Sequence, residues 1–482
     1  TAAGGVGVLP GGRLPLEDAF AWSRFARSAL HTNDIDFRMR HSSAEEASFL
    51  ARRVAGAGLG VTYTDLEHAP HVLLVALEPE EECGTAFLRL RKGMLAGRVA
   101  VTTLAPMTTR GSTKLRATVV ATIPGREAAA LERVPTDHAE LAEALAQPGA
   151  IILVGERAGA QPGTLSAAEA LAERTGARLA WIPRRAGERA AVEAGLLPGL
   201  LPGARRVADA QSRADLAAQW AVDQFPSTEG RDLAGILTAV RDGELGGLLV
   251  GGVDPLDAPD PQLVRDALAA AGFVVQLEVR RSEITDHADI VLPVAPPVEK
   301  GGTFINWEGR HRPFGQVLAS RALADRTVLD ALAREMGTAL GTATLDEVHE
   351  QLAELADWRP ETEAPMAQAV AAEAPQPGAG QAVLATWKMM IDDGRCLDGE
   401  PHLAGTAHRP VVRMSPQSAS AIGAADGSQV SVRGPRGAIT LPLALTSMPD
   451  GVVWLPQHSP GSHVNDMLGA GAGALVDLEV AR

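Results

Sequence analysis

Polar side chains that could bind a ligand gather between residues 283 and 310, a stretch that reads EITDHADIVLPVAPPVEKGGTFINWEGR. The candidates are Glu283, Thr285, Asn306, Glu308 and Arg310. A guanidinium group beside a carboxylate forms charge-assisted hydrogen bonds, often through two parallel N–H groups. These side chains therefore either form a binding site or fix loops to a sheet, and loop fixing is the commoner role of charged residues beside glycine turns.

A strand must position these side chains. Residues 288–292 form a largely apolar run, and Pro293 then lacks the backbone donor that a sheet would need. Gly301, Gly302 and Gly309 allow sharp turns in the loops that follow. The pattern predicts a buried strand with polar residues past its carboxyl end, where open α/β sheets usually bind ligands.

A second polar segment reads HTNDIDFRMR from residue 31 to residue 40. Ser42 and Ser43 follow it, and each precedes a glutamate by three residues, Glu45 and Glu46 respectively. A serine followed three residues later by a glutamate, ahead of an apolar run, is the pattern of a capping box. The segment therefore predicts a helix that starts at these serines.

These motifs carry a resemblance. The pattern E-x-T-x-x-A-D-I-V-L-P, the following E-K-G-G-T and N-W-E-G-R, and the segment T-N-D-I-D-F-R-M-R resemble the molybdopterin oxidoreductases. That family includes formate dehydrogenases, nitrate reductases and the G subunit of respiratory NADH-quinone oxidoreductase, complex I. Short strands after residue 411 and a loop containing Asn465 resemble its carboxyl-terminal barrel domain.

The resemblance implies positions for a pterin site that has degenerated, with no catalytic residue and no metal ligand in this chain. It assigns these positions to Ser42, Glu283, Asn306, Arg310 and Asn465. In relatives that bind molybdenum, the metal ligand stands where this chain has Ser42, and serine fills that role in some of them. Capping remains the favoured interpretation of Ser42 because it accounts for both serines and both glutamates.

One loop differs from the relatives that bind the cofactor. After the strand expected at 72–77 those proteins have a G-x-N-P turn, whereas this chain has Glu78, Pro79 and then Glu80, Glu81 and Glu82. Like charges about 4 Å apart repel by about 1 kcal/mol per pair even in water. We interpret the segment as a solvated acidic loop that opposes a bound dinucleotide.

The resemblance to complex I is to the carboxyl-terminal part of its G subunit, of actinobacterial type, supported by a loop rich in glycine and proline at 195–203. It implies a region without cofactor in the peripheral arm, which transfers electrons from NADH through iron-sulfur clusters to quinone. We expect 4Fe-4S and 2Fe-2S clusters in a part that precedes Thr1, and other peripheral-arm subunits as partners. We also expect a peripheral position on the cytoplasmic side of the membrane. The alternative is a catalytic subunit of the formate dehydrogenase or nitrate reductase type, with molybdopterin and Ser42 on the metal.

Composition narrows the possibilities. A length of 482 residues indicates about three domains, and a formal charge of -15 argues against nucleic acid as a partner. Two cysteines cannot supply the four thiolates of an iron-sulfur cluster, and no apolar run is long enough to insert into a membrane. The later histidines lack zinc spacing and are expected in solvated loops: His402, His408, His458 and His463.

The order of apolar runs predicts α/β domains with mostly parallel sheets, followed by a barrel or sandwich of short strands. The resemblance implies two doubly wound, mostly parallel α/β domains, one inserted in the other, followed by a carboxyl-terminal β-barrel of double-psi type. The expected boundaries are 1–41 with 226–359 for the discontinuous domain, 42–225 for the inserted domain, 360–380 for a linker and 381–482 for the barrel. Strands of the inserted domain are expected at 71–77, 99–104, 117–123, 150–154 and 178–182.

Overall fold

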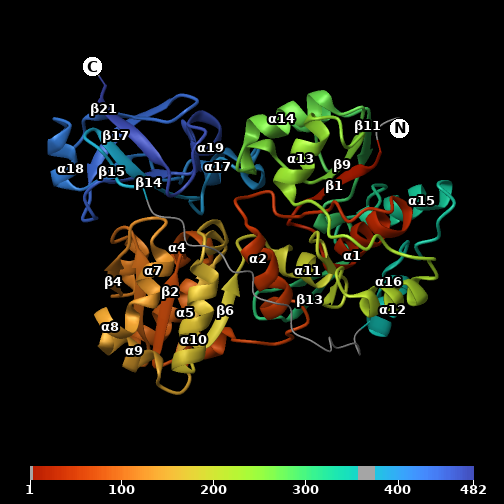
Figure 1. The fold of residues 1–482 in the computed structure, drawn as a ribbon, viewed down its shortest axis with the longest axis horizontal. Helices are drawn as coiled ribbons and strands as arrows, with labels where there is room; N and C mark the ends of the chain where they lie inside the picture. Colours follow the sequence, from red (N-terminus) through yellow and green to blue (C-terminus); the bar gives the residue numbers. More distant parts are fainter. Residues whose placement is uncertain (1–3, 356–374, 482) are drawn as a thin grey trace. The chain divides into compact units, whose positions relative to one another are not determined.

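The computed structural model describes residues 4–355 and 375–481. The chain forms two compact units, one made of residues 1–60 and 185–367 and the other of residues 61–184 and 368–482 (Figure 1). Residues 42–60 and 185–225, which the sequence assigned to the inserted domain, group with the first unit. The expected linker falls mostly outside the described residues.

The first unit is built on a parallel sheet of four strands in the order β1 (Val6–Pro10), β9 (Gly247–Gly251), β10 (Phe273–Glu278) and β11 (Ile290–Pro293). The helices α13 (Leu233–Arg241) and α14 (Pro261–Ala270) share one hydrophobic core with β1, β9 and β10. A side chain at Gly7 of β1 would come within 2.4 Å of Ile236 on α13, so glycine lets this helix pack closely on the strand.

The prediction of a buried strand before Pro293 is wrong in one respect, the burial of β11. It lies at the edge of the sheet, and Ile290 and Val291 are 44% and 39% exposed, so the strand is not buried. An apolar run cannot distinguish an edge strand from a central one, because the difference lies in the neighbouring strands.

The other elements of the first unit surround this sheet and include two antiparallel pairs, β7 with β8 and β12 with β13. Their bounds are α1 Leu16–Arg24, continued by a π-helical turn Phe25–Ala29, α2 Ala44–Phe49, continued by a π-helical turn Leu50–Val54, α11 Glu188–Glu193, β7 Leu200–Leu201, β8 Arg205–Arg206, α12 Ala210–Trp220, β12 Gly302–Ile305, β13 His311–Phe314, α15 Asp325–Glu335 and α16 Leu345–Leu355.

The second unit contains a five-stranded parallel sheet in the order β4-β3-β2-β5-β6, and all five predicted strands are present. Every residue of the interior strand β5 is buried. His138, with φ -136° and ψ 58°, separates the short helices α8 and α9. The bounds are α3 Tyr63–His68, β2 His71–Val75, α4 Pro79–Glu82, α5 Gly84–Leu95, β3 Ala100–Ala105, α6 Arg110–Lys114, β4 Thr118–Ala121, α7 Glu127–Glu132, α8 Val134–Asp137, α9 Ala139–Leu145, β5 Ile151–Gly155, α10 Thr164–Thr175 and β6 Arg178–Ile182.

The same unit contains a closed barrel, drawn in blue in Figure 1, with the strand order β14-β18-β15-β17-β16-β21. The pairs β14–β18 and β15–β17 are parallel, the other four pairs around the barrel are antiparallel, and apolar side chains fill the interior. The predicted barrel is therefore confirmed. Its elements are β14 Gln381–Trp387, α17 Pro401–Ala404, β15 Val412–Met414, α18 Pro416–Ala421, β16 Gln429–Arg433, β17 Ala438–Leu445, β18 Val452–Pro456, β19 His458–Ser459, β20 Ser462–His463, α19 Val464–Met467 and β21 Leu475–Val480.

Within the ranges 4–355 and 375–481, no helix combines the length and the apolar character that crossing a bilayer requires.

Candidate functional site

Three of the predicted site residues form the turn between β12 and β13. The Asn306 amide donates to Glu308 Oε2 at 2.7 Å, and its carbonyl oxygen accepts from the Arg310 backbone at 3.0 Å. Arg310 Nε lies 3.3 Å from Glu308 Oε2. Because the carboxylate is buried and the guanidinium half-exposed, this set closes the hairpin from its solvent side.

Glu283 is not part of that turn. It starts a 3₁₀ turn, Glu283–Asp286, and its carboxylate binds Arg265 Nε at 2.6 Å. A network that joined Glu283 to Asn306, Glu308 and Arg310 is therefore wrong for Glu283, whose partner is Arg265. Asn465 belongs to the second unit, where it is buried on α19.

The serine prediction is corrected by one residue. Ser43 caps α2, since its side chain accepts from Glu46 N at 3.2 Å, and Ser42 precedes the cap. The sequence could not separate them because each serine has a glutamate three residues later.

Residues of the HTNDIDFRMR segment hold each other in place inside the first unit. Arg38 is 1% exposed and binds Asp36 at 2.8 Å, and both Arg38 and Arg40 contact the buried Glu46. Arg40 also reaches Glu188 of α11 at 3.3 Å. These motif residues thus tie the segment after β1 to two helices.

The lysine of the E-K-G-G-T motif has a comparable role. Lys300 Nζ lies 2.6 Å from Asp18 and 2.8 Å from Asp325, and all three side chains are buried. Burial lowers the pKa of Lys300, but the two aspartates outweigh it and hold the pKa above its ordinary value. Burial in turn raises the pKa of Asp325. This ion cluster joins α1 and α15 to the loop that precedes β12.

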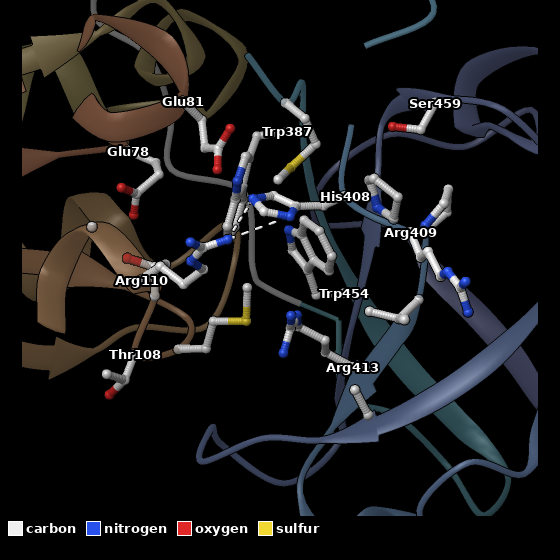
Figure 2. Close-up of a pocket in the computed structure, with 18 of the residues that line it drawn as sticks. Glu78, Glu81, Thr108, Arg110, Trp387, His408, Arg409, Arg413, Trp454 and Ser459 are labelled. Carbon is white, nitrogen blue, oxygen red and sulfur yellow. Dashed lines mark hydrogen bonds between the residues drawn. The ribbon is translucent and has the colours of Figure 1, made fainter. Parts of the chain in front are cut away.

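A cavity with convergent polar groups lies in the second unit. It has a volume of about 570 Å³ and is lined by the loops after β2 and β3, by α6 and by the barrel strands β14, β15 and β18 (Figure 2). The loops after β2 and β3 both leave the carboxyl edge of the parallel sheet, where ligands are expected in such folds.

The floor of the cavity is apolar and aromatic. Trp387 and Trp454 have ring centroids 5.1 Å apart at an angle of 53°, and Met107 packs with them. Arg413 lies over the Trp454 ring at 5.7 Å from its centroid, and burial lowers the pKa of this arginine. A guanidinium group in such a place has lost water without gaining a carboxylate.

The acidic segment after β2 is not the fully solvated loop of the prediction, because Glu78 is buried and Glu80, Glu81 and Glu82 are only partly exposed in the short helix α4. Glu78 is 6% exposed, and the Glu82 carboxylate binds Arg157 Nε at 2.8 Å. Burial raises the pKa of Glu78 to about 7, and the neighbouring Glu82 adds to the rise. A Cβ atom at Gly111 would meet Glu78 Oε1 at 2.0 Å, so glycine is needed where α6 passes this carboxylate.

Of the four histidines predicted to be solvated, His402 and His408 are exposed, but His458 is buried. His458 is 2% exposed and stands edge-on to His463, whose Nε2 lies 2.9 Å from Asp393, so His458 is not solvated. His408 is exposed at the cavity and accepts a hydrogen bond from Arg110. In the part of the chain that the structure describes, no group of three or more potential ligands could hold a metal ion.

Sequence reasoning missed this cavity because its two halves are about 300 residues apart in the chain. Arg409, Pro410 and Arg413 carry no motif, and Arg110 lies in a short polar segment. Ligands in open α/β sheets bind past the carboxyl ends of the strands, and this holds for β2 and β3 as well as for β11.

Comparison with known proteins gives the family. The family model of the molybdopterin oxidoreductases matches residues 2–325, and that of the molydopterin dinucleotide binding domain matches residues 397–475. The chain belongs to the molybdopterin oxidoreductase family, as the motifs indicated.

Two relatives within this family are similar to nearly the whole chain. The chain is 52% identical over 482 residues to the G subunit of NADH-quinone oxidoreductase from Mycobacterium tuberculosis, covering 99% of this chain and 59% of the relative. It is 47% identical over 502 residues to the protein of that name from Streptomyces coelicolor, covering 98% and 59%. The chain thus spans about three fifths of these relatives.

A solved structure confirms the fold class. Acetylene hydratase from Pelobacter acetylenicus superposes with a TM-score of 0.57 at 13% identity, covering 99% of this chain and 86% of that one. At this identity the similarity shows the fold alone.

The pterin dinucleotide of the family does not fit the residues after β2. A pyrophosphate there would face the buried Glu78, and Arg157 is already paired with Glu82. Each added negative charge in such a place is repelled and also loses water. The side chains after β2 are therefore unsuited to this group.

Proposed function

We propose that this chain is the molybdopterin oxidoreductase-like region of the G subunit in an NADH-quinone oxidoreductase of actinobacterial type. In this proposal the region is structural: it holds no pterin and no metal, and it helps to build the peripheral arm on the cytoplasmic side of the membrane. Electrons from NADH would pass to quinone through iron-sulfur clusters carried elsewhere in the complex.

The observation that carries the proposal is the 52% identity along nearly the whole chain. Similarity to the catalytic alternative is weaker, since a putative formate dehydrogenase of Bacillus subtilis is 27% identical over 168 residues, covering 34% of this chain. The buried carboxylates after β2 support the absence of a pterin. The ion clusters around Arg38 and Lys300 support a structural role for the motif residues, because each joins separate elements.

Purification from the native membrane tests the assignment. A tag on the polypeptide that contains this chain should recover, in mild detergent, the other subunits of an NADH-quinone oxidoreductase and NADH-dependent quinone reduction. Recovery of a formate- or nitrate-active assembly without NADH oxidation would refute it. An untagged strain carried through the same purification is the control.

A further inference from the structure

Two sets of opposite charges face the cavity of the second unit without neutralising each other. Arg110, Arg409 and Arg413 form no salt bridge with any residue in the described ranges. Arg110 donates to His408, and Arg413 donates to Thr446 Oγ1 at 3.1 Å. A guanidinium group without a carboxylate partner, above all one that has lost water, favours an anionic group in the cavity.

The opposite set consists of the Glu81 carboxylate and the carboxyl group of Glu78, which burial leaves partly protonated near its pKa of about 7. Glu81 Oε2 accepts from the backbone N of Met390 at 2.9 Å, and Glu78 is buried behind it at the base of α4. Within the described residues neither of them forms a salt bridge. Figure 2 shows both carboxylates on the side of the cavity from which Arg110 also projects.

The third component is aromatic. The two indoles and Met107 provide an apolar wall against which a flat ring can pack. Trp454 is 4% exposed, and its Nε1 has no acceptor among the residues that the structure describes, although buried indole N–H groups usually have one. In Figure 2 this nitrogen is on the side of the ring that faces His408 and Arg110.

We infer that the cavity binds a small aromatic zwitterion, of the class of the free aromatic amino acids. The ligand carboxylate lies at Arg110 and Arg413, its ammonium group at Glu81 and Glu78, and its ring against Trp387 and Trp454. A ligand with one charge of each sign satisfies both sets, whereas a dinucleotide places further negative charge against the glutamates. The volume of about 570 Å³ accommodates a ligand of this size. The inference does not depend on the proposed role in the respiratory complex.

The test is isothermal titration calorimetry of the full chain with three ligands that share one ring. L-tryptophan carries both charges, tryptamine lacks the carboxylate, and indole-3-propionate lacks the ammonium group. We expect a Kd below about 1 mM for L-tryptophan and affinities at least about tenfold weaker for the other two. The absence of binding by L-tryptophan, or equal binding of indole-3-propionate, would overturn the inference.

Matched variants locate the binding. Arg110→Gln and Glu81→Gln should each weaken L-tryptophan at least about tenfold, and the glutamine at position 81 retains an oxygen for Met390 N. The control pair is Arg433→Gln and Glu479→Gln, which removes an exposed salt bridge of 2.7 Å on the barrel of the same unit and should change nothing. Unchanged affinity in both cavity variants would refute the assignment to this cavity.

Discussion

Glu78 carries the clearest pH dependence. Its pKa is about 7 in the folded chain against an ordinary value of 4.5. Between those values the folded state keeps a proton that the unfolded chain has lost, so this residue makes folding less favourable as pH rises, and the penalty is complete above the folded pKa. The shift corresponds to a penalty on the order of 3 kcal/mol.

Glu78→Gln should therefore be more stable than the parent chain by up to about 3 kcal/mol near pH 8 and nearly equal to it near pH 5. The amide keeps an acceptor for the Glu80 backbone N–H. Chemical denaturation at each pH measures the free energy of unfolding of both proteins. Groups that titrate alike in the two proteins drop out of the difference between these free energies. A difference that does not vary with pH would show that Glu78 is not the group that titrates.

We expect replacement of Lys300 to cost much more stability than replacement of Arg310, although both residues belong to family motifs. Lys300→Met removes the cation between two buried aspartates and should cost about 3–5 kcal/mol of unfolding free energy. Arg310→Met should cost at most about 1 kcal/mol, because the guanidinium is 46% exposed and Asn306 still donates to Glu308. Thermal and urea unfolding of the two variants compare them directly, and an Arg310→Met cost as large as that of Lys300→Met would contradict the structure.

At the scale of elements, two adjacent serines give a matched pair. Ser43→Ala removes the hydrogen bond to Glu46 N and should cost about 1 kcal/mol, whereas Ser42→Ala should cost a few tenths of that. Urea unfolding of both variants measures it. The reverse order would move the helix start to Ser42.

The elements that sequence predicted best were those fixed by local pattern. The five strands from β2 to β6 and the barrel strands were found because their apolar runs end at glycine, proline or polar turns. The exposure of β11 and the partner of Glu283 were missed, since each depends on residues that are distant in the chain. For the same reason the cavity between Arg110 and His408 had no signal in sequence, while the turn residues Asn306 and Arg310 were correctly placed near each other.

At the scale of the whole molecule, metal content separates the two family branches. Because carboxylates stand where a pyrophosphate would lie, we expect the purified chain to contain no stoichiometric molybdenum or tungsten. Elemental analysis by mass spectrometry measures both metals, with a formate dehydrogenase prepared in parallel as the positive control. One metal atom per chain would contradict the structural role.

The discontinuity of the first unit has a consequence for synthesis of the protein. The strand β1 pairs with β9, whose partner residues begin at Gly247, while the first residue of β1 is Val6. A ribosome adding 5–20 residues per second needs on the order of 10–50 s to make the chain between them. During that interval an apolar strand has left the ribosome without its neighbour, while the parallel sheet of the second unit, encoded in between, can already close. The strand β1 therefore stays without its β9 partner for longer than the strands of the second unit's parallel sheet wait for theirs, and it is a segment that a chaperone could protect during synthesis.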